Sequence, residues 1–410
     1  VDELRLENKT LNLQSVSSFT VAEQLVLDNT NEQITWDNTS LALNGGLKLD
    51  TNGELTWKNP GNLAIGNITL NGGVLKIGKT TGSQTFVLDN STNLTLTADS
   101  EIYFNGGSIL NYSGAEVSLG KILTLDGSGQ LQNTNDLNLG AGGKLKLSEI
   151  SVAKVITSAN SLGLKIDNDT TITSLSVSNL TPVSITGGKS LSGGITVNTG
   201  GTVQLADNGT IASNISMVGG TLDADNSLTL SGTLTQSGAI TIDVADTKTL
   251  TYSGAAVSLG ANTLTLSGGG TLGNTNAFVL NNASSKLLLN SITVGSVSTS
   301  LANSGLDVDA NSTVTSLTVG HTTPVSIASG ITLSGGITVT AGSIKLDEAG
   351  TLGSTVSMSG GTLDVDETLT LSGALTQSGA IEIDVKTGEV LTYSGAAVNL
   401  GAYTLTMSGG

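Results

Sequence analysis

Short runs in which an aliphatic residue alternates with Thr, Ser, Asp or Lys recur along almost the whole chain. Examples are LKLD from Leu47, ITID from Ile240 and VSLG from Val257. Alternation with a period of two is typical of β-strands that bury one face. Gly-Gly, Ser-Gly and Asn-Gly pairs separate the runs and favour the positive φ of tight corners. The pattern therefore predicts an all-β protein of short strands with very little helix.

The sequence also repeats itself over a long interval. The residues LTYSGAAVSLGANTLTLSGG from Leu250 return as LTYSGAAVNLGAYTLTMSGG from Leu391, with 17 of 20 positions identical and an offset of 141 residues. The word YSGA begins at Tyr112, Tyr252 and Tyr393. Self-similarity at a fixed offset is the signature of a repeat architecture. The chain is therefore interpreted as a tandem duplication.

Three regions follow from this duplication. Residues 1–110 are divergent N-terminal coils, which we interpret as a cap or an adaptor. Residues 111–251 form the first repeat, and residues 252–410 form the second repeat and the start of a third. The final LTMSGG has the form of a coil in the middle of a repeat and shows no capping sequence. We therefore expect either that more protein follows or that this end docks onto another subunit.

A finer period of about 21 residues lies inside the long repeat. ITWDN at Ile34 and LTWKN at Leu55 are 21 residues apart. A coil of this length cannot bury its aliphatic row alone, and stacked neighbours close a continuous core. The sequence thus predicts a single elongated parallel β-solenoid of about 20 residues per coil. We expect a right-handed β-helix, because parallel crossovers strongly prefer that hand. A β-sandwich is the alternative, but it would need more hairpin turns and larger core residues.

Two further features refine the expected core. Aromatic residues make up only 3% of the chain, so we expect a narrow interior filled by small aliphatic side chains and without room for large rings. The chain has three prolines, Pro60, Pro182 and Pro324. Pro182 and Pro324 occupy the same place in the long repeat. Because proline cannot donate a ladder hydrogen bond, we expect both to mark a corner.

Composition and charge exclude several classes of function. The formal net charge is −17, and Arg5 is the single arginine. Nucleic acids and anionic lipids require clustered cations, so neither is an expected partner. The absence of Cys excludes disulfides and thiol chemistry. No apolar run approaches the ~18 residues that a membrane span needs. The chain opens with VDELRL, without Met or a signal peptide, and is interpreted as a mature or excised piece.

The catalytic inventory is poor. A Ser/His/Asp triad needs a histidine, and His321 is the only one in the chain. Its counterpart in the other repeat is Asn179, within similar surroundings. This exchange is typical of a corner residue rather than of a catalytic base. We therefore expect no enzymatic activity.

Paired carboxylates are the candidate metal ligands. LDAD in the first repeat returns as LDVD in the second, and a further LDVD has the counterpart LKID. Either a calcium site or the usual ending of a strand at a turn explains Asp at positions i and i+2. The calcium-binding nonapeptide GGxGxDxUx is absent. No cofactor other than calcium is expected. The candidate ligands are Asp223, Asp225, Asp307, Asp309, Asp364 and Asp366.

Two other patterns suggest binding. Trp36 and Trp57 lie one coil apart, so they could stack a sugar or plug the N-terminal end of the solenoid. Thr-x-Thr words such as LTLTAD at Leu94 and TTITS at Thr170 raise the possibility of ice binding. That function would need the same word at one position in many consecutive coils, and here the words drift.

The stretch GGTLDVDETLTLSGALTQSGAIEIDV from Gly360 resembles the repeats of autotransporter passengers and of filamentous-haemagglutinin-like adhesins. The resemblance implies a long right-handed β-helix that is exported to the bacterial surface or outside the cell. It implies a non-enzymatic structural shaft of a large surface, adhesin or filament-forming protein. Its expected partners are copies of itself end to end, the rest of a longer chain, or a host or environmental glycan or protein receptor. The alternatives are a polysaccharide-binding or polysaccharide-cleaving β-helix and an ice-binding β-solenoid.

Overall fold

The computed structural model describes residues 10–13, 19–28, 32–36, 40–59 and 62–410. Within these residues the protein is all-β and contains no helix. Parallel strands stack in about 19 turns of roughly 20 residues each, which defines a β-solenoid. The predicted fold class is therefore confirmed, whereas the right-handed coiling stays a prediction. Arg5 and Pro60 lie outside the described residues.

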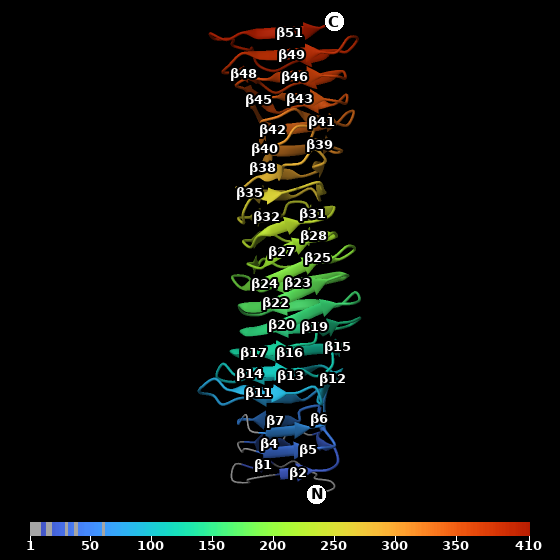
Figure 1. Ribbon diagram of the computed structural model, residues 1–410, viewed down its shortest axis with the longest axis vertical. Coiled ribbons are helices and arrows are strands. Elements are labelled where there is room, and N and C mark those ends of the chain that lie inside the picture. The colour runs from blue at the N-terminus through green and yellow to red at the C-terminus, as the bar shows by residue number, and fades with distance from the viewer. Residues whose placement is uncertain (1–9, 14–18, 29–31, 37–39, 60–61) are drawn as a thin grey trace. The chain divides into compact units, whose positions relative to one another are not determined.

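The chain divides into two compact units. The first comprises Val1–Thr196 and Gly201–Asn214, and the second comprises Val197–Gly200 and Ile215–Gly410. This division does not coincide with the repeat boundaries expected from sequence, which stay a prediction. In both units the chain alternates between two long parallel sheets, here called sheet I and sheet II (Figure 1).

Four parallel sheets make up the described part of the first unit. Sheet I contains β1 (Thr10–Asn12), β4 (Gln33–Trp36), β7 (Glu54–Trp57), β10 (Val74–Ile77), β13 (Ser100–Phe104), β16 (Ile122–Asp126), β19 (Lys144–Leu147), β21 (Gly163–Ile166), β23 (Leu180–Ile185) and β25 (Thr202–Leu205). Sheet II contains β11 (Thr85–Leu88), β14 (Ile109–Tyr112), β15 (Val117–Leu119), β17 (Gly129–Asn133), β18 (Leu137–Leu139), β20 (Ile150–Thr157), β22 (Thr170–Val177), β24 (Ser190–Val197) and β26 (Thr210–Ile211). Two short sheets contain β3 (Leu25–Leu27), β6 (Leu47–Asp50), β9 (Asn67–Asn71) and β12 (Asn93–Ala98), and β2 (Phe19–Val21), β5 (Ser40–Leu43) and β8 (Asn62–Ile65).

The second unit continues the alternation with one strand of sheet I and one or two strands of sheet II per turn. Sheet I contains β28 (Thr221–Ala224), β31 (Ile240–Val244), β34 (Thr263–Ser267), β37 (Lys286–Asn290), β39 (Gly305–Val308), β41 (Thr323–Ile327), β43 (Ser343–Leu346), β46 (Thr362–Val365), β49 (Ile381–Val385) and β51 (Leu405–Gly409). Sheet II contains β27 (Asn214–Met217), β29 (Leu228–Leu230), β30 (Leu234–Gln236), β32 (Thr249–Tyr252), β33 (Val257–Ser258), β35 (Thr271–Asn274), β36 (Phe278–Leu280), β38 (Thr293–Thr299), β40 (Ser312–Val319), β42 (Thr332–Val339), β44 (Thr351–Leu352), β45 (Thr355–Met358), β47 (Leu369–Leu371), β48 (Leu375–Gln377) and β50 (Leu391–Tyr393).

The core consists of aliphatic columns that run from turn to turn. In sheet I of the second unit, Ile240, Leu264, Leu287, Leu306 and Val325 are paired in succession. All five are buried, and their chain neighbours point outward because successive side chains of a strand face opposite sides. Burying an aliphatic side chain of this size contributes about 1.5–3 kcal/mol. Each turn is therefore held by the turns before and after it.

Large aromatic rings also lie in this core, so the prediction that it has no room for them is wrong. Trp36 and Trp57 are paired in register on β4 and β7 and are buried. Phe104 is likewise buried, and glycine makes room for its ring, because a Cβ at Gly129 would clash with the Cβ and Cγ of Phe104. Small residues in an adjacent turn thus let a narrow solenoid hold large rings.

A buried tyrosine explains why the word YSGA recurs. The hydroxyl of Tyr112 donates a hydrogen bond to the carbonyl of Ala115 at 2.8 Å and accepts one from the backbone N–H of Leu94 at 3.2 Å. Leu94 belongs to the preceding turn, so one side chain closes a corner and joins two turns. A Cβ at Gly114 would clash with the tyrosine ring. Tyr252 and Tyr393 make the equivalent pairs of bonds.

Pro182 and Pro324 lie inside strands, so the prediction that they mark a corner is wrong. Pro182 is the third residue of β23 and Pro324 is the second residue of β41. The pairing with the preceding turn begins only at the next residue, Val183 in β23 and Val325 in β41. Each proline therefore stands where a missing N–H costs no ladder hydrogen bond.

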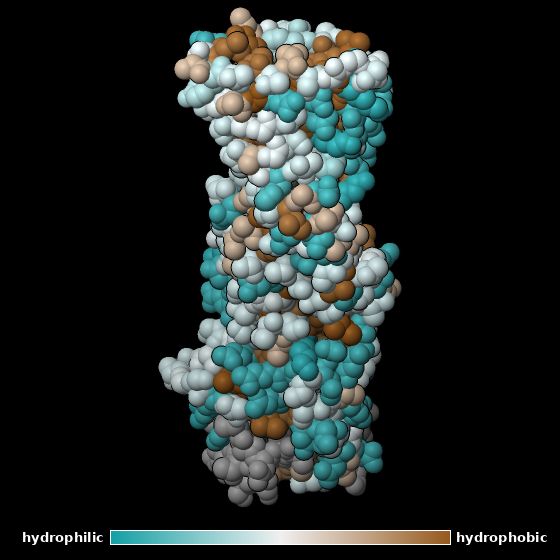
Figure 2. Space-filling model, turned by 45° about the horizontal axis from the view of Figure 1, so that its top comes forward, coloured by the Kyte–Doolittle hydropathy of each residue, from teal (hydrophilic) through white to brown (hydrophobic). Residues whose placement is uncertain are grey.

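The surface is mostly polar or neutral in the view of Figure 2, and apolar atoms gather where the last turn lies. The exposed apolar side chains of this turn are Val390, Leu400, Tyr403 and Met407. The last turn has a neighbouring turn on one side only, which leaves these side chains uncovered.

Candidate functional site

A column of hydroxyl side chains runs along the outer face of sheet II in the second unit. Register places one hydroxyl on each of five successive strands, β38, β40, β42, β45 and β48. Neighbouring strands lie about 4.8 Å apart, so the hydroxyls form a regular row. All of them are half-buried or exposed. The members are Ser298, Thr318, Thr338, Ser357 and Thr376.

Sequence reasoning missed this column. Its members are separated by 20, 20, 19 and 19 residues, so a search at one fixed period does not align them. The strand pairing nevertheless keeps them in register, because the corners absorb the difference in length. The Thr-x-Thr words that drift along the sequence therefore give an aligned row in the structure.

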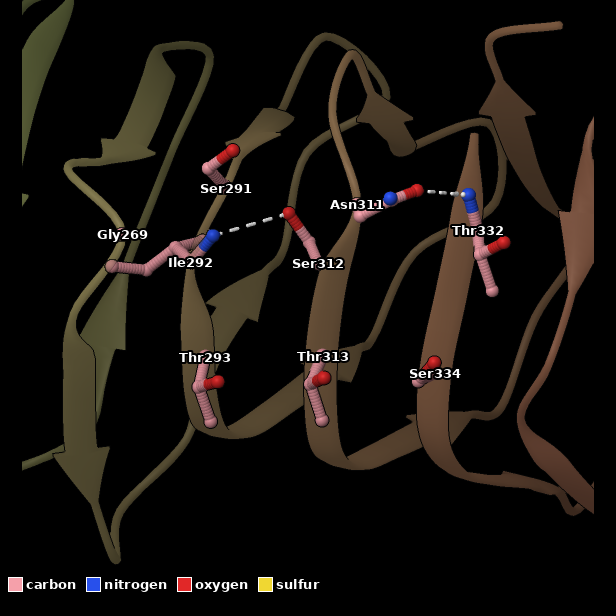
Figure 3. Close-up of a pocket in the computed structure, with 9 residues that line it drawn as sticks. All are labelled: Gly269, Ser291, Ile292, Thr293, Asn311, Ser312, Thr313, Thr332 and Ser334. Carbon is pink, nitrogen blue, oxygen red and sulfur yellow. Dashed lines mark hydrogen bonds between the residues drawn. The ribbon is translucent and has the colours of Figure 1, made fainter. Parts of the chain in front are cut away.

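A shallow groove of about 380 Å³ lies next to this column (Figure 3). Thr293, Thr313 and Ser334 lie in a row on adjacent strands of the groove. Other polar groups hold the turns together. Ser312 Oγ accepts a hydrogen bond from the N–H of Ile292 at 3.3 Å and donates one to the carbonyl of Ala310 at 2.9 Å.

The chemistry of this groove is that of hydrogen-bonding hydroxyls and amides. Asn311 Oδ1 accepts a hydrogen bond from the N–H of Thr332 at 2.8 Å (Figure 3). The described lining residues include neither a carboxylate nor a histidine. The groove therefore offers hydrogen bonds to a ligand and brings together neither a nucleophile with a base nor an acid with a base.

The six predicted aspartates lie in three places. Asp223 and Asp364 face outward from sheet I, where Asp223 is paired in register with Asp243 and Asp364 with Asp384. Burial and then the charges of Asp225 and Asp243 raise the pKa of Asp223 to about 6. Burial also raises the pKa of Asp364, with Asp366 adding to the effect and Lys345 opposing it.

The remaining aspartates lie beside lysines or at strand ends. Asp307 forms an ion pair with Lys286, and Asp366 lies 2.6 Å from Lys345 Nζ. Asp225 and Asp309 follow the ends of β28 and β39. No group of three or more His, Asp or Glu side chains among the described residues is arranged to hold a metal ion. Calcium binding therefore stays a prediction, and the structure does not bring the six aspartates into one site.

The tryptophans cannot act as the predicted sugar-stacking residues in this structure. Trp36 is 1% exposed and Trp57 is 2% exposed. The Trp57 ring meets the edge of the Phe86 ring at a centroid distance of 4.7 Å, and Trp36 lies against Phe19 at 6.4 Å. A sugar can stack only on an accessible ring face, so this interpretation is wrong. A role of the two rings in plugging the solenoid stays a prediction.

His321 lies at an exposed corner. Its backbone carbonyl accepts a hydrogen bond from Thr323 Oγ1 at 3.0 Å. In the other repeat the carbonyl of Asn179 accepts the equivalent bond from Thr181 at 3.2 Å. The corner therefore uses the backbone of this residue, which explains why histidine and asparagine exchange there.

Comparisons with protein-family models, with curated proteins and with solved structures gave no match for this chain. Across the ranges that the structure describes, no helix has the length and hydropathy needed to cross a membrane.

Proposed function

We propose that this chain is a non-enzymatic structural segment of an exported bacterial surface or filament-forming protein. Its work is to be extended and stiff, and to present other parts of an assembly at a distance. The observation that supports this proposal is the turn-to-turn register. Within each unit, aliphatic columns and parallel ladders run from one turn to the next, and the described polar groups mostly bridge adjacent turns.

Such construction suits a mechanical role. Each turn contacts only its neighbours, so stability grows with the number of interfaces rather than with the size of one core. The buried tyrosines and the aliphatic columns repeat the same contacts along the chain. A segment built in this way gains length without gaining a pocket suited to chemistry.

Solution scattering and protease resistance test the proposal. We expect a pair-distance distribution typical of an elongated particle and cleavage restricted to the N-terminal region and the corners. Glycan panels incubated with the purified chain should show no cleavage. A compact particle would contradict the structural proposal, as would glycan cleavage that is lost in Asp364→Ala.

The hydroxyl column supports a second candidate function, binding to a regular lattice of water such as ice. Thermal hysteresis of the purified chain measures this activity. Thr338→Tyr should abolish it, because a bulky ring interrupts the column. Thr265→Tyr on sheet I is the matched control and should keep it. Absence of hysteresis in the unmodified chain would exclude this candidate and leave the structural proposal unaffected.

A further inference from the structure

A second groove, of about 490 Å³, lies in the first unit at the corner that follows sheet I. The ends of β13, β16, β19 and β21 and the residues just after them line it. Its volume falls in the range of roughly 300–1,000 Å³ that is usual for small-molecule sites. The lining residues that matter for recognition are Tyr103, Asn105, Asp126, Ser148, Glu149 and Asn168.

Tyr103 brings an accessible aromatic ring to this groove. Its neighbours Ile102 and Phe104 are buried, so the alternation of β13 turns Tyr103 outward. Register places it between Lys76 of β10 and Asp126 of β16. The Lys76 ammonium is held by Glu54 at 2.7 Å. The half-buried tyrosine therefore combines an apolar face with a polar hydroxyl.

The polar side chains around the ring are held in place by neighbouring turns. Asp126 Oδ1 accepts a hydrogen bond from the N–H of Gly127 at 2.7 Å, which leaves the second carboxylate oxygen to accept another. Asn168 Nδ2 donates to Ser148 Oγ at 3.0 Å, and Asn105 Nδ2 donates to the carbonyl of Gly78 at 3.4 Å. These bonds fix the amides while their carbonyl oxygens stay able to accept hydrogen bonds.

We propose that this groove binds an uncharged sugar unit of a glycan chain. An apolar ring face matches the C–H face of a sugar, and the surrounding carboxylate and amide oxygens accept hydrogen bonds from its hydroxyls. The described lining residues include two carboxylates and no cation. An acidic sugar is therefore repelled, and a neutral one is favoured.

The internal duplication supports the specificity of this site. One repeat later, Asp243 and Ser267 occupy the same paired positions as Tyr103 and Asp126. The equivalent corner thus lacks an aromatic platform, although the backbone arrangement repeats. The proposed sugar site belongs to the first unit alone, and this separates it from the solenoid architecture common to both units.

The test titrates the purified chain with neutral cello-, malto-, xylo- and manno-oligosaccharides, and with oligogalacturonate as the acidic probe. Saturation-transfer NMR and calorimetry report binding. At least one neutral oligosaccharide should bind with a Kd of about 1 mM or lower. Tyr103→Ala should weaken binding about tenfold, and Tyr103→Phe should retain most of it. Tyr403→Ala replaces another accessible tyrosine, which is 48% exposed, and should bind like the unmodified chain.

Hydrogen exchange gives a readout that does not depend on the variants. The neutral oligosaccharide should protect amides at residues 104–107, 126–128 and 148–149 and leave those of the second unit unchanged. Absence of binding by every neutral probe would overturn the proposal, and so would binding of oligogalacturonate alone. Equal binding by folded Tyr103→Ala, or protection confined to other segments, would also overturn it.

Discussion

Asp223 lies directly opposite Asp243 in the parallel register of β28 and β31. Burial and the charges of Asp225 and Asp243 raise the pKa of Asp223 from 3.8 to about 6. An unfolded chain keeps the lower value, so the folded state holds more protons between these two pH values. The free energy of unfolding must therefore fall as pH rises through this window.

Asp223→Asn should consequently stabilise the protein above pH 6. The expected gain is about 1 kcal/mol, once solvent screening around this half-buried group is taken into account. Below pH 3.8 the carboxyl is protonated in both states, and the gain should vanish. Thermal melts of the two proteins from pH 3.5 to pH 7.5 check this. A gain that is the same at both ends of the range would contradict the prediction.

Asp364→Asn is the matched control in the other repeat. Lys345 lies opposite Asp364 in the register of β43 and β46 and lowers the pKa that burial raises. Removing the Asp364 charge should therefore stabilise the protein less than removing that of Asp223, because an attraction is lost together with the penalty. The same melts at pH 7.5 compare the two variants, and a larger gain for Asp364→Asn would count against this account.

Tyr252→Phe should destabilise the protein by about 1–3 kcal/mol, the cost of leaving buried polar groups without partners. The lost hydroxyl donates to the carbonyl of Ala255 at 2.6 Å and accepts from the N–H of Leu234 at 3.2 Å. Urea unfolding measures the change. Tyr403→Phe alters an exposed ring and should have a negligible effect. An equally small effect for Tyr252→Phe would show that these two bonds contribute little.

Gly163 and Gly305 occupy the same position in the two repeats but differ in backbone conformation. Gly163 has a φ of 78°, and a Cβ there would clash with the carbonyl of Pro182, whereas Gly305 has open space around it. Gly163→Ala should therefore destabilise the protein by about 1–3 kcal/mol. Gly305→Ala should be neutral or slightly stabilising. Calorimetric melting temperatures distinguish the two outcomes, and similar shifts for both variants would refute the prediction.

Leu266 and Met407 form a second matched pair. Leu266 is fully buried between Ile242 and Leu289, whereas Met407 is 64% exposed. Leu266→Ala should lower local stability by about 2–5 kcal/mol, because it leaves a cavity in the aliphatic column. Met407→Ala should change little. Amide hydrogen exchange in β34 and β37 measures the local effect, and unchanged protection in Leu266→Ala would contradict it.

Alternation along the chain predicted the strands and the orientation of their side chains. It also contained information on the aromatic residues that the sequence interpretation did not use. Trp36 is two residues after Ile34 and therefore shares its buried face, whereas Tyr103 is one residue after Ile102 and faces outward. The period of two thus indicates Tyr103, and not the tryptophans, as the aromatic ring available to a ligand.

Other features could not be predicted from a single fixed period. The column that includes Thr318 and Thr338 depends on strand pairing across turns of unequal length. The grooves depend on which corners lie next to one another, and this is a property of the stacked turns. The place of Pro182 inside a strand depends on where pairing with the previous turn begins. Local sequence does not specify that boundary.

The unequal spacing within the hydroxyl column has a consequence for how such a chain can change. Strand pairing fixes the position of each side chain on the face, and the corners absorb one or two extra residues without shifting it. Insertions and deletions at corners are therefore compatible with an unchanged outer surface. A lineage can vary its loops freely while it conserves the pattern that this surface presents, and an engineer can graft peptides at the corners for the same reason.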